Sequence, residues 1–341
     1  MAEKSLLKSA ILMLVIVLTS VFGWEYFLHS KGYVLGYNDD EPLWAKNRAQ
    51  VYEPQENATV FIGSSRIKFD LDIPTWEKTT GEKAIQLAIA GSNPRLALDN
   101  LAADEKFKGK LIIDITEVLF FRPVDDAELT KRLKYLKEVT PSQKFSAEVG
   151  FGLESQLLFI DKDFFSLNAL LDRLPIPNRP GIHGAVMWPP KFTTTNFRRQ
   201  EKMTDDFVKD TSMQRQVKNI WVMFGALSKQ HGVSGDTLQK IFNEVQTDVA
   251  KIKARGGRVI FTRTPSSGGY WENEPISYPR AEYYDKLLSI TGCNGIHFKD
   301  YPELRDFTCP EWSHLKPTDA VLYTSAVIKI LDQQKWFTHS N

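Results

Sequence analysis

The sequence lacks a large excess of either positive or negative charge. Its 341 residues carry 43 basic and 42 acidic side chains, which leaves a net charge of +1. Such a balance produces no long-range field that would attract a nucleic acid, and no zinc-binding or RNA-binding signature is present. We therefore expect no nucleic-acid partner.

Cysteine and metal-binding patterns are scarce. The two cysteines, Cys293 and Cys309, permit at most one disulfide, and two free buried thiols fit the sequence equally well. His183, His231 and His297 lack the spacing of metal ligands. The Ser-Ser-Gly-Gly stretch lacks the G-x-x-x-x-G-K-[ST] pattern of a phosphate-binding loop. We predict neither a metal nor a cofactor.

One long apolar run is present, at the N-terminus, in "MAEKSLLKSAILMLVIVLTSVFGWEYF". Its uncharged part, residues 9–24, is slightly shorter than the ~20 residues of a typical membrane span. Lys8 precedes it, and Trp24 and Tyr26 end it, as suits the two membrane interfaces. We expect a retained anchor over residues 1–28, with a cytoplasmic N-terminus and an extracytoplasmic main domain. A cleaved signal peptide is the alternative, although no A-x-A site is present.

The rest of the chain is expected to fold as one α/β domain. Residues 29–57 have the composition of a linker with one helical piece. Beyond them, short β-rich runs alternate with helical patterns, which predicts a parallel sheet covered on both faces, a three-layer α/β/α domain over residues 58–341. The expected strands are 58–63, 83–90, 110–116, 258–264 and, more weakly, 295–301; the expected helices include 93–104, 235–257 and 316–334.

Residues 122–234 break this alternation. The stretch is rich in aromatic residues and interrupted by proline, as in "LPIPNRPGIHG" and "VMWPPKFTTTNFRRQ". We expect a long insertion near the mouth of the functional site, where such segments provide specificity. A separate small domain is the alternative.

Two adjacent serines follow the first expected strand in "FIGSSRIKF". Ligands bind outside the carboxyl ends of parallel strands, so Ser64 and Ser65 occupy a favourable position. A serine there can present its hydroxyl beside the N–H groups of the next helix, which can stabilise an oxyanion. The alternative is a serine that only caps that helix.

An acid-x-x-His pattern lies just before the last expected helix, in "CPEWSHLKPTDAVLYTS". Glu311 precedes His314 by three residues, close enough across a turn to contact the imidazole. A carboxylate in that position would fix the histidine tautomer and stabilise the imidazolium.

Together these motifs resemble the SGNH (GDSL-like) hydrolase superfamily, and within it the membrane-anchored branch similar to the DltD and alginate O-acetylation proteins. The resemblance covers residues 57–121 and 236–334 and implies a flavodoxin-like sheet. It implies that Ser65 is the nucleophile, His314 the general base and acid, and Glu311 the residue that orients the histidine. Family members usually carry aspartate at the last position, and Asp306 is the alternative acid here.

The family's oxyanion hole implies three donors. The first two are the Ser65 amide and Gly91, which follows the second strand. The third is normally an asparagine after the third strand, but "LIIDITEVLFF" has Thr116 or Glu117 near that place. Asn93, beside Gly91, is the proposed substitute.

Four side chains are predicted to contact the substrate. Arg66 follows the serine pair, and the loop "TRTPSSGGYWENEPISYPR" after the fourth strand supplies Arg263, Tyr270 and Arg280. Aromatic and arginine side chains on such a loop suit a sugar or an anionic polymer, and ordinary loop packing is the alternative.

These features predict a serine esterase or O-acyltransferase that acts on acyl esters of a cell-envelope glycan or polymer. Acyl transfer would imply a multi-span membrane acyltransferase as a partner, by resemblance alone. One alternative is a catalytically silent scaffold that binds polymer or that membrane partner. A lipase or lysophospholipase is the other.

Overall fold

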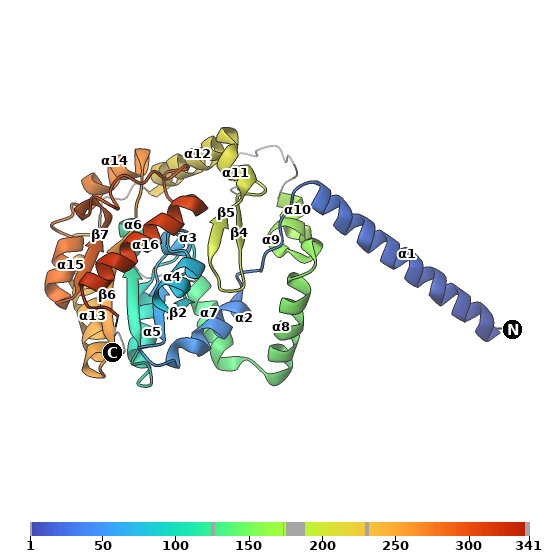
Figure 1. Ribbon diagram of the computed structural model, residues 1–341, viewed down its shortest axis with the longest axis horizontal. Helices are drawn as coiled ribbons and strands as arrows, with labels where there is room; N and C mark the ends of the chain where they lie inside the picture. Colours follow the sequence, from blue (N-terminus) through green and yellow to red (C-terminus); the bar gives the residue numbers. More distant parts are fainter. Residues whose placement is uncertain (1, 124–126, 173, 175–187, 229–231, 338–341) are drawn as a thin grey trace.

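The computed structural model describes residues 2–123, 127–172, 174, 188–228 and 232–337 (Figure 1). Five parallel strands form the central sheet, in the spatial order β2-β1-β3-β6-β7. Their bounds are β1 Ala58–Ile62, β2 Lys83–Gln86, β3 Lys110–Asp114, β6 Arg258–Arg263 and β7 Asn294–His297. The predicted α/β architecture with a parallel sheet is therefore confirmed.

Helices cover both faces of the sheet. Successive strand residues point to opposite faces, so Val60 and Ile62 belong to one apolar cluster and Phe61 to the other. Strands buried on both faces have nearly continuous apolar sequences, which explains why they could be predicted from the sequence. Val60 and Ile62 pack with α5 (Arg95–Ala103), α13 (Gly235–Ala254) and α15 (Tyr284–Thr291). Phe61 packs with α3 (Ser65–Asp70), α4 (Ile73–Thr80) and α16 (Pro317–Gln333).

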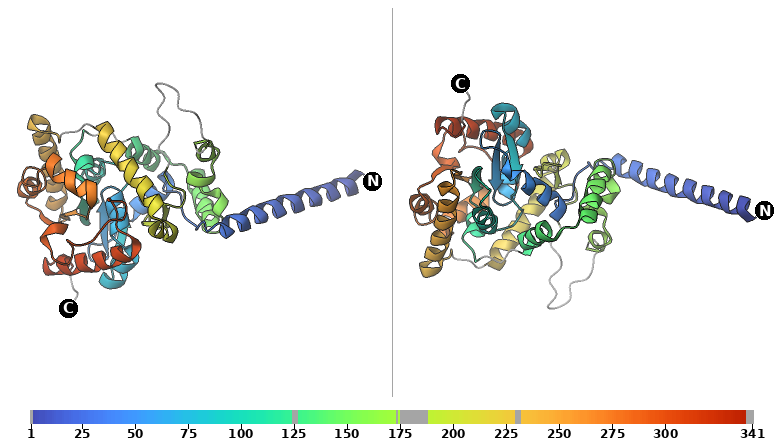
Figure 2. Two further views of the ribbon diagram at one scale, coloured as in Figure 1. Left: turned by 90° about the horizontal axis from the view of Figure 1, so that it is seen from above. Right: turned by 90° about the horizontal axis from the view of Figure 1, so that it is seen from below.

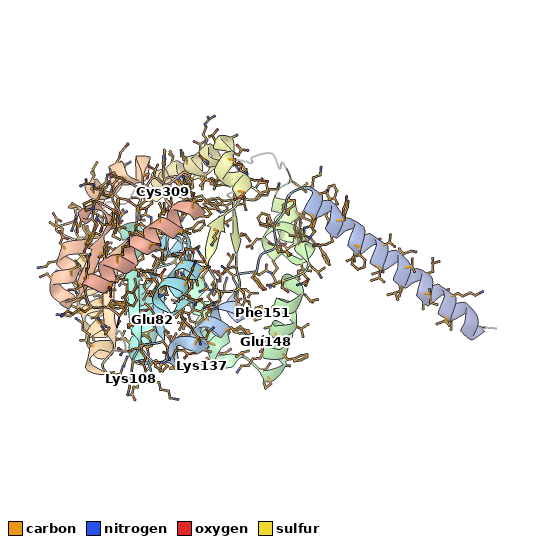
Figure 3. All side chains as sticks on the ribbon, in the orientation of Figure 1. Glu82, Lys108, Lys137, Glu148, Phe151 and Cys309 are labelled. Atoms are coloured by element: carbon orange, nitrogen blue, oxygen red, sulfur yellow. The ribbon has the colours of Figure 1, made fainter. Side chains whose placement is uncertain are left out.

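The two cysteines do not form a disulfide. Cys293 lies in the cluster under α13 and α15. Cys309, labelled in Figure 3, lies in the cluster under α16, on the other side of the sheet. Each is a free buried thiol, and burial raises the pKa of the Cys309 thiol well above its usual range. The alternative of two free thiols is therefore correct, because the sheet separates them.

The segment expected as a linker packs against the α/β domain. It contains α2 (Glu41–Arg48) and the short helix η1 (Ala49–Tyr52), and it buries Leu43, Trp44 and Val51. The indole of Trp44 donates a hydrogen bond to the carbonyl of Leu87 at 3.1 Å. Residues 41–52 therefore contribute to the core.

The stretch 122–234 supplies several helices and a small hairpin. Its elements are α7 (Ala127–Glu138), α8 (Pro141–Glu154), η2 (Leu158–Ile160), α9 (Lys162–Phe165), α10 (Leu167–Asp172), β4 (Thr193–Thr195), β5 (Glu201–Met203), α11 (Asp205–Lys209) and α12 (Thr211–Ser228). Strands β4 and β5 are antiparallel to each other and separate from the main sheet. The remaining short helices are α6 (Glu117–Phe120), α14 (Gly268–Ser277) and η3 (Phe298–Asp300).

Buried charges fasten this hairpin to the carboxyl end of the sheet. Arg199, in the β4–β5 turn, is fully buried and donates to the carbonyl of Gln86, the last residue of β2, at 2.7 Å and to that of Ala88 at 3.0 Å. Its guanidinium also pairs with Asp39, which in turn pairs with the buried Lys68 of α3. Removing one partner of such a buried pair leaves an uncompensated charge, at a cost of roughly 3–5 kcal/mol.

The N-terminal helix α1 (Ala2–Ser30) projects from the body (Figures 1 and 2). Among the described residues it is the one helix long and apolar enough to cross a membrane, and its Leu6–Ser30 part fits either an anchor or a signal sequence. Its last two turns are fixed to the body: Glu25 accepts hydrogen bonds from the N–H groups of Leu158 at 2.7 Å and Phe159 at 3.3 Å, and Leu28 is buried.

Candidate active site

Ser65 lies where β1 gives way to α3, at the carboxyl end of the sheet. The turn needs a glycine at position 63, because a Cβ there would lie 2.8 Å from Ile67 and 2.9 Å from Asp114. Ser64 occupies the N-cap position but makes no side-chain cap; its buried hydroxyl instead hydrogen-bonds the Thr116 hydroxyl at 2.7 Å. Ser65, the first residue of α3, is partly exposed, and its hydroxyl contacts His314 instead.

His314 meets Ser65 across the structure. Its Nε2 lies 2.8 Å from the Ser65 hydroxyl, and its Nδ1 lies 2.7 Å from Oε1 of Glu311. With the ring proton on Nδ1, the imidazole donates to the carboxylate and accepts from the serine. Ser65, His314 and Glu311 thus form a continuous hydrogen-bonded chain with the order and distances of a Ser-His-acid triad.

Several backbone contacts fix the loop that carries His314. The N–H of Leu315, the next residue, donates to the Asp70 carboxyl group at 2.9 Å, which ties the loop to the end of α3. On the other side, the N–H of Ser267 donates to the carbonyl of Trp312 at 2.9 Å. The histidine is therefore held between α3, which begins with Ser65, and the loop after β6.

Glu311 and His314 are buried, with exposed fractions of 0% and 2%. Both carboxylate oxygens of Glu311 are satisfied: Oε1 accepts from the His314 backbone and ring, and Oε2 accepts from the Trp221 indole at 2.5 Å. Phe69 stacks on the imidazole with ring centroids 4.2 Å apart. A buried carboxylate needs such a full set of partners to stay in place.

The alternative acid lies elsewhere. The Asp306 side chain is 84% exposed, and its nearest ionic partner is Arg305 at 3.8 Å. Among the two carboxylates considered from the sequence, Glu311 is the one that contacts His314.

A large cavity opens at Ser65 and His314, with a volume of about 1080 Å³. Much of its wall comes from the stretch 122–234 and from the segment that follows α1. Near the imidazole the wall is aromatic, with ring contacts that run from His314 through Trp221 to Trp188. Other lining residues are Gly36, Tyr37, Asp39, Lys68, Arg122 and Phe192.

The predicted oxyanion donors separate into two groups. Gly91 lines the cavity together with Ser65 and adopts a left-handed backbone conformation with φ +67°. Asn93 does not line it: its buried amide donates to the carbonyl of Arg122 at 3.3 Å and braces the loop after β3. Thr116, which stands near the family's asparagine position, does line the cavity.

Two of the four predicted substrate contacts lie in the cavity wall. Arg66 and Tyr270 both line it, and the Arg66 guanidinium lies 5.5 Å from the centre of the Tyr270 ring. Arg66 is almost fully buried and pairs with Glu274 of α14. Although burial raises the pKa of Glu274, Arg263 and Arg66 together lower it to about 2.

The other two predictions are not supported by the placement of the side chains. Arg263 points into the protein, where it pairs with Glu117 at 3.1 Å, and it does not line the cavity. Arg280 lies at the surface and bridges Asp285 at 2.9 Å and Asp300 at 2.5 Å. In both cases acidic neighbours determine where the guanidinium lies.

Within the described residues, no group of three or more His, Cys, Asp or Glu side chains is arranged to hold a metal ion. His297 is buried between Tyr284 and Phe298. Burial, together with nearby Arg263, lowers the pKa of its imidazole to about 3. His183 and His231 lie outside the described residues.

Comparisons with known proteins add no identification. No protein-family model matches this chain, and no curated protein matches it. The geometry of Ser65, His314 and Glu311 in their cavity is therefore the basis for a functional assignment.

Trp221 is a site residue that the sequence does not indicate, because its partner Glu311 is 90 residues away. We expect Trp221→Phe to leave Oε2 of Glu311 buried without a donor, at a cost of about 1–3 kcal/mol in unfolding free energy. A shifted carboxylate should also lower kcat on an acyl ester by roughly a hundredfold. Trp188→Phe is the control, because that ring shares the aromatic wall without bonding Glu311; equal losses in both variants would contradict a specific role.

Asp114 beneath the site makes stability depend on pH. It is fully buried, its Oδ2 has no hydrogen-bond partner, and burial raises its pKa from 3.8 to about 6. The folded state thus binds this proton more tightly than the unfolded chain, so its contribution to stability falls as pH rises from about 4 to 6.

We expect Asp114→Asn to be more stable than wild type at about pH 7.5, by up to roughly 3 kcal/mol, with the difference shrinking toward pH 4. Thermal unfolding of both proteins, followed by circular dichroism across this range, measures it. A difference that does not change with pH would contradict the assignment.

Proposed function

We propose that this chain is a membrane-anchored, extracytoplasmic serine esterase or O-acyltransferase of the SGNH (GDSL-like) type. Its substrate class would be the acyl esters of a cell-envelope glycan or polymer. The observation that supports this most is the hydrogen-bonded chain Ser65–His314–Glu311 at the wall of a large cavity.

The sheet supports the family assignment. Numbered along the chain, its five parallel strands lie in the order 2-1-3-4-5, the order of flavodoxin-like sheets. The serine follows the first of these strands and the acid-x-x-His pattern precedes the last helix, which are the positions that the SGNH resemblance implies.

The proposed reaction uses the triad in two steps. Ser65 Oγ attacks the ester carbonyl while His314 Nε2 takes the serine proton, and Glu311 stabilises the resulting imidazolium. The amides of Ser65 and Gly91 would hold the oxyanion, with the Thr116 hydroxyl as a third donor in place of Asn93. His314 then gives its proton to the departing alkoxide, which leaves Ser65 acylated.

In the second step the acyl group leaves the enzyme. His314 takes a proton from water or from a glycan hydroxyl, whose oxygen attacks the acyl-serine. Collapse of that intermediate returns the proton to Ser65 and releases either the free acid or the acylated glycan. Transfer from a membrane donor would require a multi-span acyltransferase partner, by analogy with the family alone.

The test is direct detection of the acyl-enzyme. Full-length protein in detergent is incubated with p-nitrophenyl acetate, quenched in acid and analysed by intact mass. A covalently acetylated protein supports the proposal, and an acylated product on addition of a glycan fragment identifies transfer. Folded protein that shows no acyl-enzyme would favour the silent scaffold, and a strict requirement for long-chain esters would favour a lipase.

A further inference from the structure

The point at which α1 leaves the body is fixed. Glu25 binds the N–H groups that open η2, and Leu28 is buried beside them. Beside these two residues, Trp24, Tyr26 and Phe27 remain exposed on the last turns of α1. Aromatic side chains at the end of an apolar helix are typical of the membrane interface.

Helix α8, which precedes η2 in the chain, presents an apolar stripe to the outside. Phe145, Val149 and Leu153 follow each other at intervals of four, so they share one face, and they are 74%, 47% and 48% exposed. The opposite face carries Phe151, labelled in Figure 3, which is buried. Its ring packs against Phe197 with ring centroids 5.5 Å apart. The stripe therefore points away from the core.

Helix α10, which follows η2, has a second stripe. Leu167, Leu170 and Leu171 are 70%, 47% and 46% exposed at helical spacing. Its other face belongs to the cavity, whose wall includes Asn168 and Ala169. One short helix thus has the cavity on one side and an exposed leucine surface on the other.

Both stripes lie on the side of the body from which α1 departs. Figures 1 and 2 show α8, α9 and α10 together beside the base of α1, with α16 on the far side of the sheet. We call the six exposed residues the basal face: Phe145, Val149, Leu153, Leu167, Leu170 and Leu171. Grouped exposed apolar residues of this kind are uncommon on soluble monomers and mark interaction surfaces.

We propose that the basal face rests on the lipid bilayer at the boundary of headgroups and acyl chains. This proposal rests on the proposed insertion of α1. A spanning helix that is clamped at Glu25 brings the surface around its base to the headgroup level, where amphipathic helices bury their apolar side. Lipid is therefore the occupant that continuity with α1 favours over a second protein.

This docking would define how the site receives its substrate. Because α10 lines the cavity on one side and contributes to the basal face on the other, the cavity is held next to the membrane surface rather than at the end of a flexible tether. The acyl donor or acceptor would then be a molecule presented at the outer headgroup layer.

Fluorescence quenching by lipid tests the docking. Full-length variants Val149→Cys and Leu170→Cys are labelled with a thiol-reactive fluorophore; the native Cys293 and Cys309 are buried, and unsubstituted protein reports their background. They are reconstituted into phospholipid nanodiscs with or without quencher-bearing lipids; the quencher lies near the headgroup for positions 149, 170 and 322 and in the acyl chains for position 16. Ile16→Cys serves as the anchor probe, and Leu322→Cys on α16, 60% exposed, as the distant control.

We expect quenching at positions 149 and 170 well above that at 322. No excess quenching at either basal position overturns the docking, whatever the anchor probe shows. Quenching at position 16 by the acyl-chain quencher supports the insertion of α1, and its absence overturns the anchor and the docking together. Acyl-enzyme formation by the same labelled proteins is read separately, so a failure of the catalytic proposal is distinguishable from both.

Discussion

Replacing Ser65 by alanine is expected to abolish acyl-enzyme formation and to lower the rate of ester hydrolysis by roughly six orders of magnitude. The physical reason is that Ser65 provides the only triad oxygen aligned with His314 Nε2, at 2.8 Å. The remaining oxyanion donors would leave a small residual rate. An activated serine attacks a fluorophosphonate probe with loss of fluoride, so the mass of the intact protein shows whether Ser65 is activated. The fall in rate is measured as hydrolysis of a soluble ester.

Ser64→Ala is the matched control for this experiment. Ser64 is adjacent in sequence, but its hydroxyl is buried and bonded to Thr116 rather than to the imidazole. We expect one adduct on wild type and on Ser64→Ala, and none on Ser65→Ala or His314→Ala. An adduct that persists on Ser65→Ala would show that another nucleophile reacts.

Replacing Glu311 by glutamine should be almost as damaging, with a loss in kcat of about 10⁴-fold. A carboxylate accepts from the His314 backbone, the His314 ring and the Trp221 indole, and an amide cannot accept all three in the same geometry. The glutamine would favour the wrong histidine tautomer, which cannot accept the Ser65 proton. Hydrolysis of a soluble ester, compared over a range of pH, measures the loss.

The control for Glu311 is Asp306→Asn. This carboxylate is exposed and remote from the imidazole, so its loss should leave kcat and KM unchanged. A large effect at Asp306 with a small effect at Glu311 would show that the acid is assigned to the wrong residue. Glu311→Asp adds a further comparison, since it keeps the charge but shortens the reach to the ring.

The features that sequence predicted well are those determined locally. Strands buried on both faces are continuous apolar runs, and the placement of Ser65 follows from being at the end of the first of them. The contact between Glu311 and His314 spans three residues, so it needs only a turn. The contact between Ser65 and His314, by contrast, depends on the packing of α16 against α3. From the sequence it could be expected only through the family resemblance.

The features that sequence missed depend on contacts between distant segments. Asn93 and Arg263 have suitable chemistry and suitable places in the chain, but neither lines the cavity. Asn93 instead donates to the carbonyl of Arg122 after β3, and Arg263 pairs with Glu117. Trp221 lies in a stretch without clear periodicity, and only folding brings its indole to Glu311. Side-chain direction after a strand end is decided by such partners, which a single sequence does not show.

The segment between α1 and α2 has a consequence for how this protein can be divided. Tyr37 donates its backbone N–H to the carbonyl of Thr195 at 2.8 Å, and Asp39 pairs with Arg199. Tyr37 and Asp39 also line the cavity. A soluble version that began at residue 58 would lack part of the cavity wall and leave Arg199 buried without its carboxylate. Helix α1 and the α/β body are therefore not interchangeable modules: a graft onto another N-terminal helix must join upstream of Glu25, where contacts with the body begin.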